Sequence, residues 1–327
     1  MLFRSDRARF VALGASVVGK APAVLLEGDG AGEATESYLR RRGFSSEAIE
    51  GFFRPLFGVV TLDRSLSADA GYFRFLVAML AWGPAVIPSD GVGMVAEWTT
   101  ATIRQAGGVV ELGARVSRLE CDGSGRRIAG VHMEDGRVLS ARYVVLAVEA
   151  PAARALLAPV DAEAAERLPT EAAASVTAAF ALSRPLYHGR AIVLNAEPGD
   201  GGEGRVDLLC QTTNITRPGA PDGPHILLAT RVTTGGGGSQ GLVDAVGALV
   251  RRWAPRFDWA GLAEPIGVYE HAFAQFRPLA GVRQGLPGPR TAIDNLVLAG
   301  DLTTHPSIEG AVASGFRAAE IVVALNP

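Results

Sequence analysis

The stretch Asn295-Leu296-Val297-Leu298-Ala299-Gly300-Asp301, followed by Pro306-Ser307-Ile308-Glu309-Gly310-Ala311, predicts a strand, a loop and a helix. Residues 296–299 form a short apolar run that is typical of a strand buried on both faces of a parallel sheet. Asp301 follows Gly300 at the carboxyl end of this strand, where open α/β sheets bind their ligands. We therefore expect the Asp301 carboxylate to accept a hydrogen bond from a ligand hydroxyl group.

The predicted helix begins at Ser307, which is a suitable N-cap, and it carries the acid Glu309 in its first turn. An apolar stripe suited to packing on a sheet follows, made of Ile308, Ala311, Val312, Gly315, Ala319, Val322 and Val323. Small residues in the first two turns would let the start of the helix approach a planar ligand. Because the first amides of a helix have no partner within it, they favour an oxygen that gains negative charge.

This segment closely resembles the carboxyl-terminal flavin motif of the FAD-dependent amine oxidase and phytoene desaturase superfamily. In that family the Gly-Asp pair contacts the ribityl chain and the pyrophosphate, and the amides of the following helix face the isoalloxazine ring. The resemblance therefore implies FAD as the cofactor, bound by Gly300, Asp301, Ser307, Ile308, Glu309, Gly310 and Ala311. The alternative is an ordinary strand-helix unit with another purpose.

A second part of the implied cofactor site lies in the middle of the chain. Short strands are expected at residues 109–112 and 114–120. The segment Arg115-Val116-Ser117 resembles the family's adenine-binding strand, which uses backbone groups. The resemblance therefore implies that backbone groups of Val116 bind the adenine end of FAD.

The next segments predict a small meander and a return strand. Residues 128–133 and 137–141 alternate around Glu134-Asp135-Gly136, which predicts a hairpin with a type I′ turn. Residues 143–148 are continuously apolar, so we expect a central parallel strand. This order of elements resembles the middle of a glutathione-reductase-like FAD-binding domain.

The expected fold class is α/β, with a Rossmann-type FAD-binding domain interleaved with an α+β substrate domain. The expected domain limits are residues 1–92 for a helical, apolar part of the substrate domain, 93–150 for the middle of the FAD-binding domain, 151–290 for the main part of the substrate domain and 291–327 for the carboxyl-terminal strand and helix of the FAD-binding domain.

A glycine-rich dinucleotide turn is missing where this family leads one to expect it. Such flavoproteins open with a strand, a Gly-x-Gly-x-x-Gly turn and a helix, but residues 1–30 contain no such turn. We therefore expect the chain to be truncated at its amino terminus, without the dinucleotide-binding unit. Gly236-x-Gly238-x-x-Gly241 matches the spacing, yet residues 235–238 are four consecutive glycines, which favour a flexible loop.

Composition excludes several other classes of protein. The net charge of −3 and the scattered basic residues give no reason to expect a nucleic-acid partner. Two cysteines are too few for a disulfide framework or a zinc site, which indicates a reducing cytoplasm. The sequence contains no metal-ligand cluster, no Ser-His-Asp spacing and no run of about eighteen apolar residues.

The expected substrate domain carries two aromatic segments, residues 52–57 and 72–82. They are interpreted either as a buried helical core or as the wall of a tunnel for a long apolar substrate. Residues 266–273 alternate as in a strand. The family has a strand here that faces the flavin, so the pocket candidates are Tyr269, His271, Phe273 and Gln275. A plain sheet strand would show the same pattern.

The resemblance implies an oxidoreductase in which flavin accepts a hydride. Many amine oxidases of the superfamily use a lysine at the flavin, but the only lysine here, Lys20, lies far from any matching motif. We therefore expect a phytoene-desaturase-like or protoporphyrinogen-oxidase-like dehydrogenase of a hydrophobic small molecule, with peripheral membrane contact for substrate access. The alternatives are a flavin amine oxidase and a truncated, non-catalytic remnant that is unable to bind FAD. The sequence assigns no catalytic residue.

Overall fold

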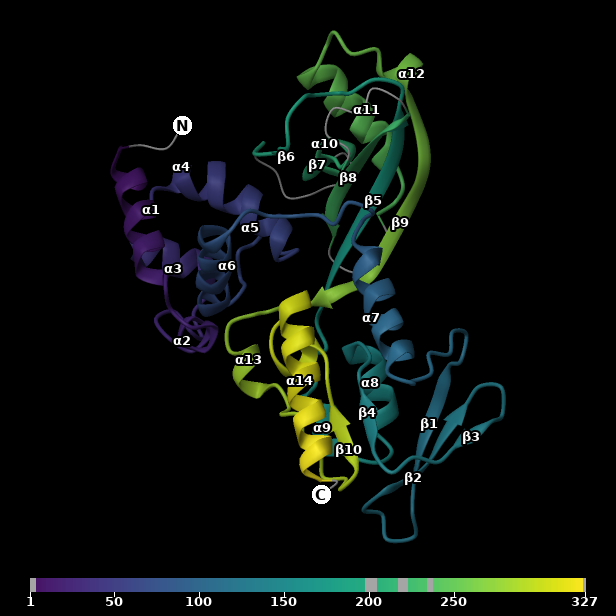
Figure 1. The fold of residues 1–327 in the computed structure, drawn as a ribbon. Coiled ribbons are helices and arrows are strands. Elements are labelled where there is room, and N and C mark those ends of the chain that lie inside the picture. The colour runs from purple at the N-terminus through teal and green to yellow at the C-terminus, as the bar shows by residue number, and fades with distance from the viewer. Residues whose placement is uncertain (1–3, 198–204, 217–222, 234–237, 326–327) are drawn as a thin grey trace. The chain divides into compact units, whose positions relative to one another are not determined.

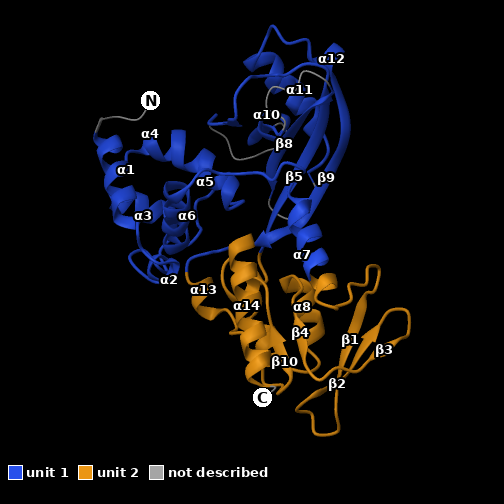
Figure 2. Cartoon of the chain, viewed as in Figure 1, with its two compact units in different colours: residues 1–102, 172–280 blue, residues 103–171, 281–327 orange. Residues whose placement is uncertain are grey.

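The chain divides into two compact units, which Figure 2 shows in different colours. The computed structural model describes residues 4–197, 205–216, 223–233 and 238–325. Unit 1 comprises residues 1–102 and 172–280, and unit 2 comprises residues 103–171 and 281–327. Each unit is therefore built from segments that lie far apart in the sequence. The domain limits expected at residues 92, 150 and 290 stay predictions.

The first part of unit 1 is helical (Figure 1). Its helices are α1 (Arg4–Val17), α2 (Pro22–Leu26), α3 (Thr35–Arg41), α4 (Ser46–Ala48), η1 (Ile49–Phe53), α5 (Arg54–Val60) and α6 (Ala70–Trp82), and α7 (Gly93–Gln105) crosses from unit 1 into unit 2. Gly43 follows α3 with a φ of +80°. The Ser45 hydroxyl accepts the Ala48 amide at 3.1 Å and caps α4.

The aromatic residues of these helices pack against one another. The ring centroids of Phe57 and Phe73 lie 4.6 Å apart, and those of Phe44 and Phe53 lie 4.8 Å apart, both edge to face. Phe53, Phe57 and Phe73 are buried. Of the two interpretations of the aromatic segments, these contacts support the buried helical core, because the rings fill the space between the helices.

A five-stranded antiparallel sheet forms the rest of unit 1, in the order β6-β7-β8-β5-β9. Its strands are β5 (Ala172–Leu182), β6 (Ile192–Leu194), β7 (Leu208–Gln211), β8 (His225–Thr233) and β9 (Ala263–Phe276). The strand expected at residues 266–273 is part of the longer β9.

One face of this sheet is buried against α11 (Leu242–Trp253). Alternate residues of β5 point to this face, and with α11 they form a core that includes Val176, Ala178, Phe180, Leu182, Leu242, Val246 and Val250. Two short helices, α10 (Thr213–Thr216) and α12 (Trp259–Leu262), complete this part of unit 1. The opposite face of β5 carries Ser175 and Thr177 together with the small residues Ala179 and Ala181.

Unit 2 holds two sheets and several helices (Figure 1). One sheet is antiparallel, with β1 (Val116–Cys121), β2 (Ile128–Met133) and β3 (Val138–Leu139), and the other is parallel, with β4 (Val144–Leu146) and β10 (Leu296–Leu298). The helices are α8 (Ala150–Leu157), α9 (Ala162–Arg167), α13 (Val282–Gly285), η2 (Asp301–Thr303) and α14 (Ile308–Ala324). The strand, loop and helix predicted at residues 296–323 are thus confirmed.

Asn295 joins the two sheets of unit 2. Its side chain is buried, its Oδ1 accepts the Ile128 amide at 2.7 Å, and its Nδ2 donates to the Ile128 carbonyl at 3.0 Å. The same Nδ2 donates to the Arg142 carbonyl at 3.2 Å, just before β4. Because it bonds to the start of β2 and to the segment ahead of β4, this one amide group sets the start of β10 against both strands.

The structure corrects the predicted packing face of α14. Ile308, Val312 and Val323, which the stripe placed against the sheet, are 52 to 71% exposed. The buried residues are instead Gly310, Ser314 and Ala318. Ala318 packs against Val297 and Ala299, and of the predicted stripe the partly buried Val322 packs against this cluster. Small side chains are needed on this face because the helix lies close to the strand, as the Ser314 hydroxyl shows by accepting the Gly300 amide at 2.6 Å.

Three further expectations for unit 2 are wrong. Residues 109–112 form no strand, and Val109 and Leu112 are more than 80% exposed. The turn between β2 and β3 is not type I′, because only Gly136, and not Asp135, has a positive φ. β4 is parallel as expected, but it is not central, since within the described residues it pairs only with β10.

No helix in the part of the chain that the structure describes is both long enough and apolar enough to span a membrane.

Candidate functional site

The carboxyl end of β10 is shaped by Gly300. Its φ of +116° and ψ of 169° lie in a region that side chains of other residues rarely adopt, so glycine is required there. Its amide donates to Ser314 Oγ at 2.6 Å, which ties the end of the strand to the second turn of α14. This contact places Asp301 beside the start of α14.

Asp301 is half-buried at the end of β10, in a place that disfavours its charged form. Burial raises the pKa of its carboxyl group, the amide of Leu302 opposes this by hydrogen bonding, and the nearby carboxylate of Glu149 raises the pKa further. A charge in such a place costs stability unless a donor reaches it. A hydrogen-bond donor that reaches the Asp301 carboxylate would therefore reduce this cost.

The first turn of α14 leaves two amide donors open. Ser307 caps the helix, and its hydroxyl accepts the Gly310 amide at 2.8 Å. The Ala311 amide donates to the Ser307 carbonyl at 3.0 Å. Among the described residues, no hydrogen bond engages the amides of Ile308 and Glu309. Of the predicted helix-start residues, these two can therefore donate to an acceptor outside the protein.

Neighbouring atoms of the protein leave no room for a side chain at Gly310. A Cβ atom at Gly310 would lie 2.4 Å from the His305 carbonyl oxygen and 2.8 Å from Thr304 Oγ1. The loop that precedes α14 thus folds closely over its first turn. The sequence pattern predicts that this glycine allows close approach of a ligand, whereas the structure shows close approach of the loop.

His305 lies in this loop and is buried, and its Nε2 atom lies 2.9 Å from Glu309 Oε2. Burial lowers the pKa of the His305 imidazole, Glu309 opposes this effect, and the charges of Arg283 and Arg317 lower the pKa further. The imidazole is therefore neutral at pH 7. Neither His305 nor Glu149 is predicted from the sequence, and for both the only available signal is their position next to predicted element ends.

Val116, the predicted adenine-binding residue, is the first residue of β1 and is half-buried. It pairs with Met133, and the register shifts between Val116 and Arg118. Such an irregularity leaves backbone groups without their regular ladder partners. Val116 belongs to the antiparallel sheet, while the other predicted cofactor residues gather around the carboxyl end of β10.

The four pocket candidates of β9 belong to unit 1. Tyr269 pairs with Thr177 of β5 and His271 pairs with Ser175, so both lie on the face that does not carry the α11 core. On the same face Thr177 Oγ1 lies 3.0 Å from Thr230 Oγ1.

The other two candidates depart from this arrangement. The register shifts between Ala173 and Ser175, which places Phe273 in a bulge. Gln275 Nε2 donates to the Thr61 carbonyl at 2.8 Å. The structure therefore gives Gln275 a structural contact, and it leaves Tyr269 and His271 together on one face.

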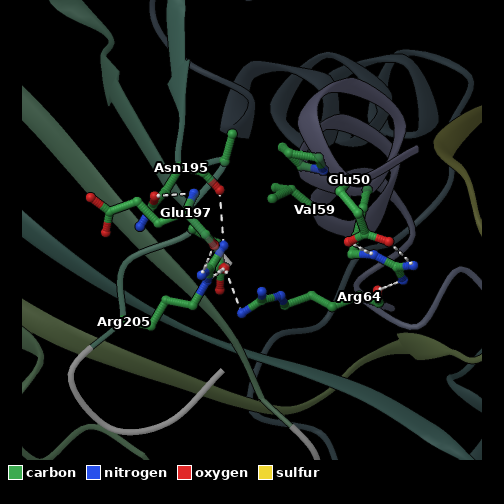
Figure 3. A pocket seen from close by; sticks show the side chains of 10 residues that line it. Glu50, Val59, Arg64, Asn195, Glu197 and Arg205 are labelled. Carbon is green, nitrogen blue, oxygen red and sulfur yellow. Dashed lines mark hydrogen bonds and ion pairs between the residues drawn. The ribbon is translucent and has the colours of Figure 1, made fainter. Parts of the chain in front are cut away.

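A small charged pocket of about 90 Å³ lies elsewhere in unit 1, and Figure 3 shows its lining. Asp207 is buried and is paired with Arg205 at 2.7 Å and Arg64 at 3.3 Å. On its other side Arg54 is paired with Glu50 at 2.7 Å. Because its charges neutralise one another within the protein, this pocket does not present an unbalanced charge to a substrate.

In the glycine loop before α11, Gly236 lies outside the described residues. The carbonyl of the described Gly238 accepts a hydrogen bond from the buried Arg231 guanidinium at 2.7 Å. Phosphate-binding loops instead turn their amides toward the anion. No group of His, Cys, Asp or Glu in the described residues could hold a metal ion.

Comparison with known proteins decides the family. The model of the flavin containing amine oxidoreductases matches residues 4–323. The chain belongs to this family. No curated protein matches the chain. As a member of the family it is a flavin-dependent oxidoreductase, which confirms the predicted superfamily and class of enzyme.

Solved structures share the fold of this flavin amine oxidoreductase. An oxidoreductase from Methanosarcina mazei has a TM-score of 0.69 at 17% identity, over 98% of this chain and 73% of its own. Cyclohexylamine oxidase from Brevibacterium oxydans IH-35A has a TM-score of 0.60 at 19% identity, over 99% and 74%. A triple mutant of putrescine oxidase has a TM-score of 0.61 at 14% identity, over 98% and 74%.

The residues at the end of β10 fit a flavin. The open amides of Ile308 and Glu309 suit the carbonyl and ring-nitrogen edge of the isoalloxazine, which gains negative charge on reduction. The half-buried Asp301 carboxylate suits a hydroxyl donor such as the ribityl chain. The exposed apolar side chain of Ile308 lies beside these donors and could cover one face of a ring.

Proposed function

We propose that this chain carries the flavin-binding part of an FAD-dependent dehydrogenase that oxidises an apolar small molecule by removing a hydride from carbon. The observation that carries the proposal is the arrangement at the end of β10. There, Asp301 and the two open amides of α14 are separated only by the loop of residues 302–307. The Asp301 carboxylate can accept from the hydroxyl-bearing chain of a flavin, and the two amides can donate to the polar edge of its ring.

The residues of the chain would then have distinct roles. Bound FAD supplies the hydride acceptor. The Ile308 and Glu309 amides, together with the positive end of the α14 macrodipole, hold the polar edge of the ring and favour negative charge there. Asp301 orients the ribityl chain, and Gly300 and Ser314 keep Asp301 in place. Val116 contributes backbone groups to the adenine end.

The choice of an apolar substrate rests on two features of unit 1. The sheet face with Tyr269 and His271 also carries the small or apolar residues Ala179, Leu228 and Gly267, which pair across the three strands. Lys20 is exposed after the end of α1, so it is not placed to hold a buried water as a lysine does in many amine-oxidising members. An isoprenoid-like or porphyrinogen-like substrate fits this surface, and we propose that it is taken up through peripheral membrane contact.

We further infer that residues outside this sequence hold the nucleotide half of FAD. Two features support this inference: the edge of β4 opposite β10 is open within the described residues, and the related structures extend beyond the part that this chain matches. A strand-turn-helix unit with a Gly-x-Gly-x-x-Gly turn, docked beside β4, would extend the parallel sheet and bind the pyrophosphate.

A flavin-binding titration tests the proposal. FAD and riboflavin fluorescence would be followed as the protein is added, for the wild type and for Asp301→Ala. We expect quenching by the wild type and at least about tenfold weaker binding by the variant, because a hydrogen bond to a charged group contributes about 1.5–3 kcal/mol. Equal affinities would remove Asp301 from the site, and absence of quenching with both flavins would contradict the proposed cofactor site.

The substrate class is tested with the flavin-loaded protein under anaerobic conditions. We expect bleaching of the flavin absorbance by an acyclic polyene precursor or a porphyrinogen, and no bleaching by cyclohexylamine or putrescine. Bleaching by the amines alone would establish the alternative, a flavin amine oxidase. If FAD binds but no compound of either class reduces it, the interpretation as a non-catalytic remnant gains support.

A further inference from the structure

Glu309 carries a negative charge in the first turn of α14, where the amides of Ile308 and Glu309 make no hydrogen bond within the described residues. An acidic side chain in the first turn of a helix is normally drawn toward the amides of its own helix, because the macrodipole is positive there. In this structure the Ser307 hydroxyl takes the Gly310 amide, and no hydrogen bond among the described residues joins the Glu309 carboxylate to the Ile308 or Glu309 amide. The carboxylate instead meets His305, with 2.9 Å between Oε2 and Nε2.

The position of His305 is set by the backbone around it. The Thr304 amide donates to the Asp301 carbonyl at 2.8 Å, which holds the loop to the end of β10. The His305 carbonyl lies against Gly310, where a Cβ atom would come within 2.4 Å. The His305 side chain is only 7% exposed, whereas the Glu309 side chain is 52% exposed. The imidazole is therefore the fixed partner, and the glutamate is the partner that could move.

We propose that His305 is a positioning residue: by holding the Glu309 carboxylate, it keeps the open amides of Ile308 and Glu309 free for the ligand. Without His305, the carboxylate would turn to these amides and compete with the ligand's acceptor atoms for them. It would also place a negative charge where a reduced flavin gains one. The inference rests on the proposed function, because the ligand in question is the flavin ring edge.

The charge state of the pair is consistent with this role. Burial, together with Arg283 of α13 and Arg317 of α14, lowers the pKa of His305, and only Glu309 opposes the effect. The 2.9 Å contact is within hydrogen-bond distance but lacks hydrogen-bond direction in this structure, and a small turn of the exposed Glu309 side chain would let the neutral imidazole donate from Nε2 to the carboxylate. A side chain with a neutral N–H donor of similar length should therefore still hold the Glu309 carboxylate in place of His305. Glutamine is such a side chain.

The experiment measures FAD affinity by fluorescence quenching for five variants beside the wild type. His305→Ala should bind roughly tenfold more weakly, a loss that corresponds to about 1.4 kcal/mol, because the Glu309 carboxylate then competes with the ligand for the helix N-terminus. The double variant His305→Ala with Glu309→Gln should recover to within about threefold of the wild type, because the competing charge is gone. His305→Gln should bind like the wild type. Glu320→Gln removes an exposed acid from the same helix, away from its start, and should change nothing.

Two outcomes would overturn the proposal. His305→Ala could bind FAD as tightly as the wild type, or the double variant could bind as weakly as His305→Ala, which would mean that the histidine acts only through the fold. Glu309→Gln alone covers the case in which His305→Ala fails to fold. It should bind at least as tightly as the wild type, and a clear loss of affinity would contradict the proposal.

A second measurement separates this inference from the proposed function. Amide resonances of Ile308 and Glu309 are followed by NMR while FAD is added to the wild-type protein. Shifts at these amides with equal affinity for His305→Ala would refute only the role of His305. The absence of shifts at both amides would show that the flavin does not bind there, which refutes the proposed site and the inference together.

Discussion

Asp301 and Glu149 follow the carboxyl ends of the paired strands β10 and β4, and both burial and the Glu149 carboxylate raise the pKa of Asp301. Its ionisation therefore costs free energy in the folded protein without ligand. The pKa of Asp301 is higher in the folded protein than in the unfolded chain, so the protonated carboxyl group favours the folded state. This contribution to stability is fully present below the ordinary pKa and is lost as the pH rises through the folded pKa. At neutral pH the ionised group destabilises the fold.

Asp301→Asn is thus expected to make the ligand-free protein more stable at pH 7 and to weaken flavin binding at the same time. The measurement is thermal unfolding from pH 4 to pH 7, in which the advantage of the variant should grow with pH. Asp294→Asn changes an exposed acid before β10 and is the control. A lower melting temperature for Asp301→Asn would show that the carboxylate is structural instead.

The glycines of α14 should differ sharply in their response to alanine. Gly310→Ala forces its Cβ atom against the His305 carbonyl, so the loop must move. We expect the free energy of unfolding to fall by about 2 kcal/mol or more, and we expect the variant to lose flavin binding. Gly315→Ala has no atom within 4 Å of the new Cβ and should gain about 0.5–1 kcal/mol from helix propensity. Urea unfolding measures both, and similar effects of the two changes would contradict the close packing of the loop on α14.

Asn295 is expected to be the most sensitive polar side chain of unit 2. Asn295→Ala leaves the amide and carbonyl of Ile128 without their partner in a buried place, which costs about 2–3 kcal/mol. We expect the loss to appear in urea unfolding and in hydrogen exchange of β2 and β10. A variant with unchanged exchange in both strands would show that the two sheets hold together without Asn295.

His305 should make stability depend on pH in the opposite sense to Asp301. Burial lowers its folded pKa below the ordinary value of 6.5, so its unfolded form binds a proton first as the pH falls. The contribution of the neutral His305 imidazole to the free energy of unfolding is present above pH 6.5 and is lost as the pH falls toward the folded pKa. We expect His305→Gln to lose less stability than the wild type between about pH 8 and pH 5 in urea titrations. If stability changed equally with pH in the two proteins, His305 would not be a buried, neutral imidazole.

Local features of the chain could be predicted from the sequence because they depend on residues close together in it. Ser307 and Ser45 cap helices through hydroxyls that reach amides three residues away, and α11 begins and ends where its periodicity does. The apolar run before Gly300 likewise indicated a buried strand, and Asp301 at its end followed from the general position of ligands in parallel sheets. The family motif combined these local signals.

Only the tertiary structure decided which partners these elements meet. The packing face of α14 is lined by Gly310, Ser314 and Ala318 because the helix must lie close to β10, a condition that no hydrophobic stripe reveals. The contact of His305 with Glu309 depends on a folded loop, and the influence of Glu149 on Asp301 depends on the pairing of β4 with the distant β10. Sequence patterns record local spacing, whereas burial and the electrostatic field at a site come from segments that meet only in the folded chain.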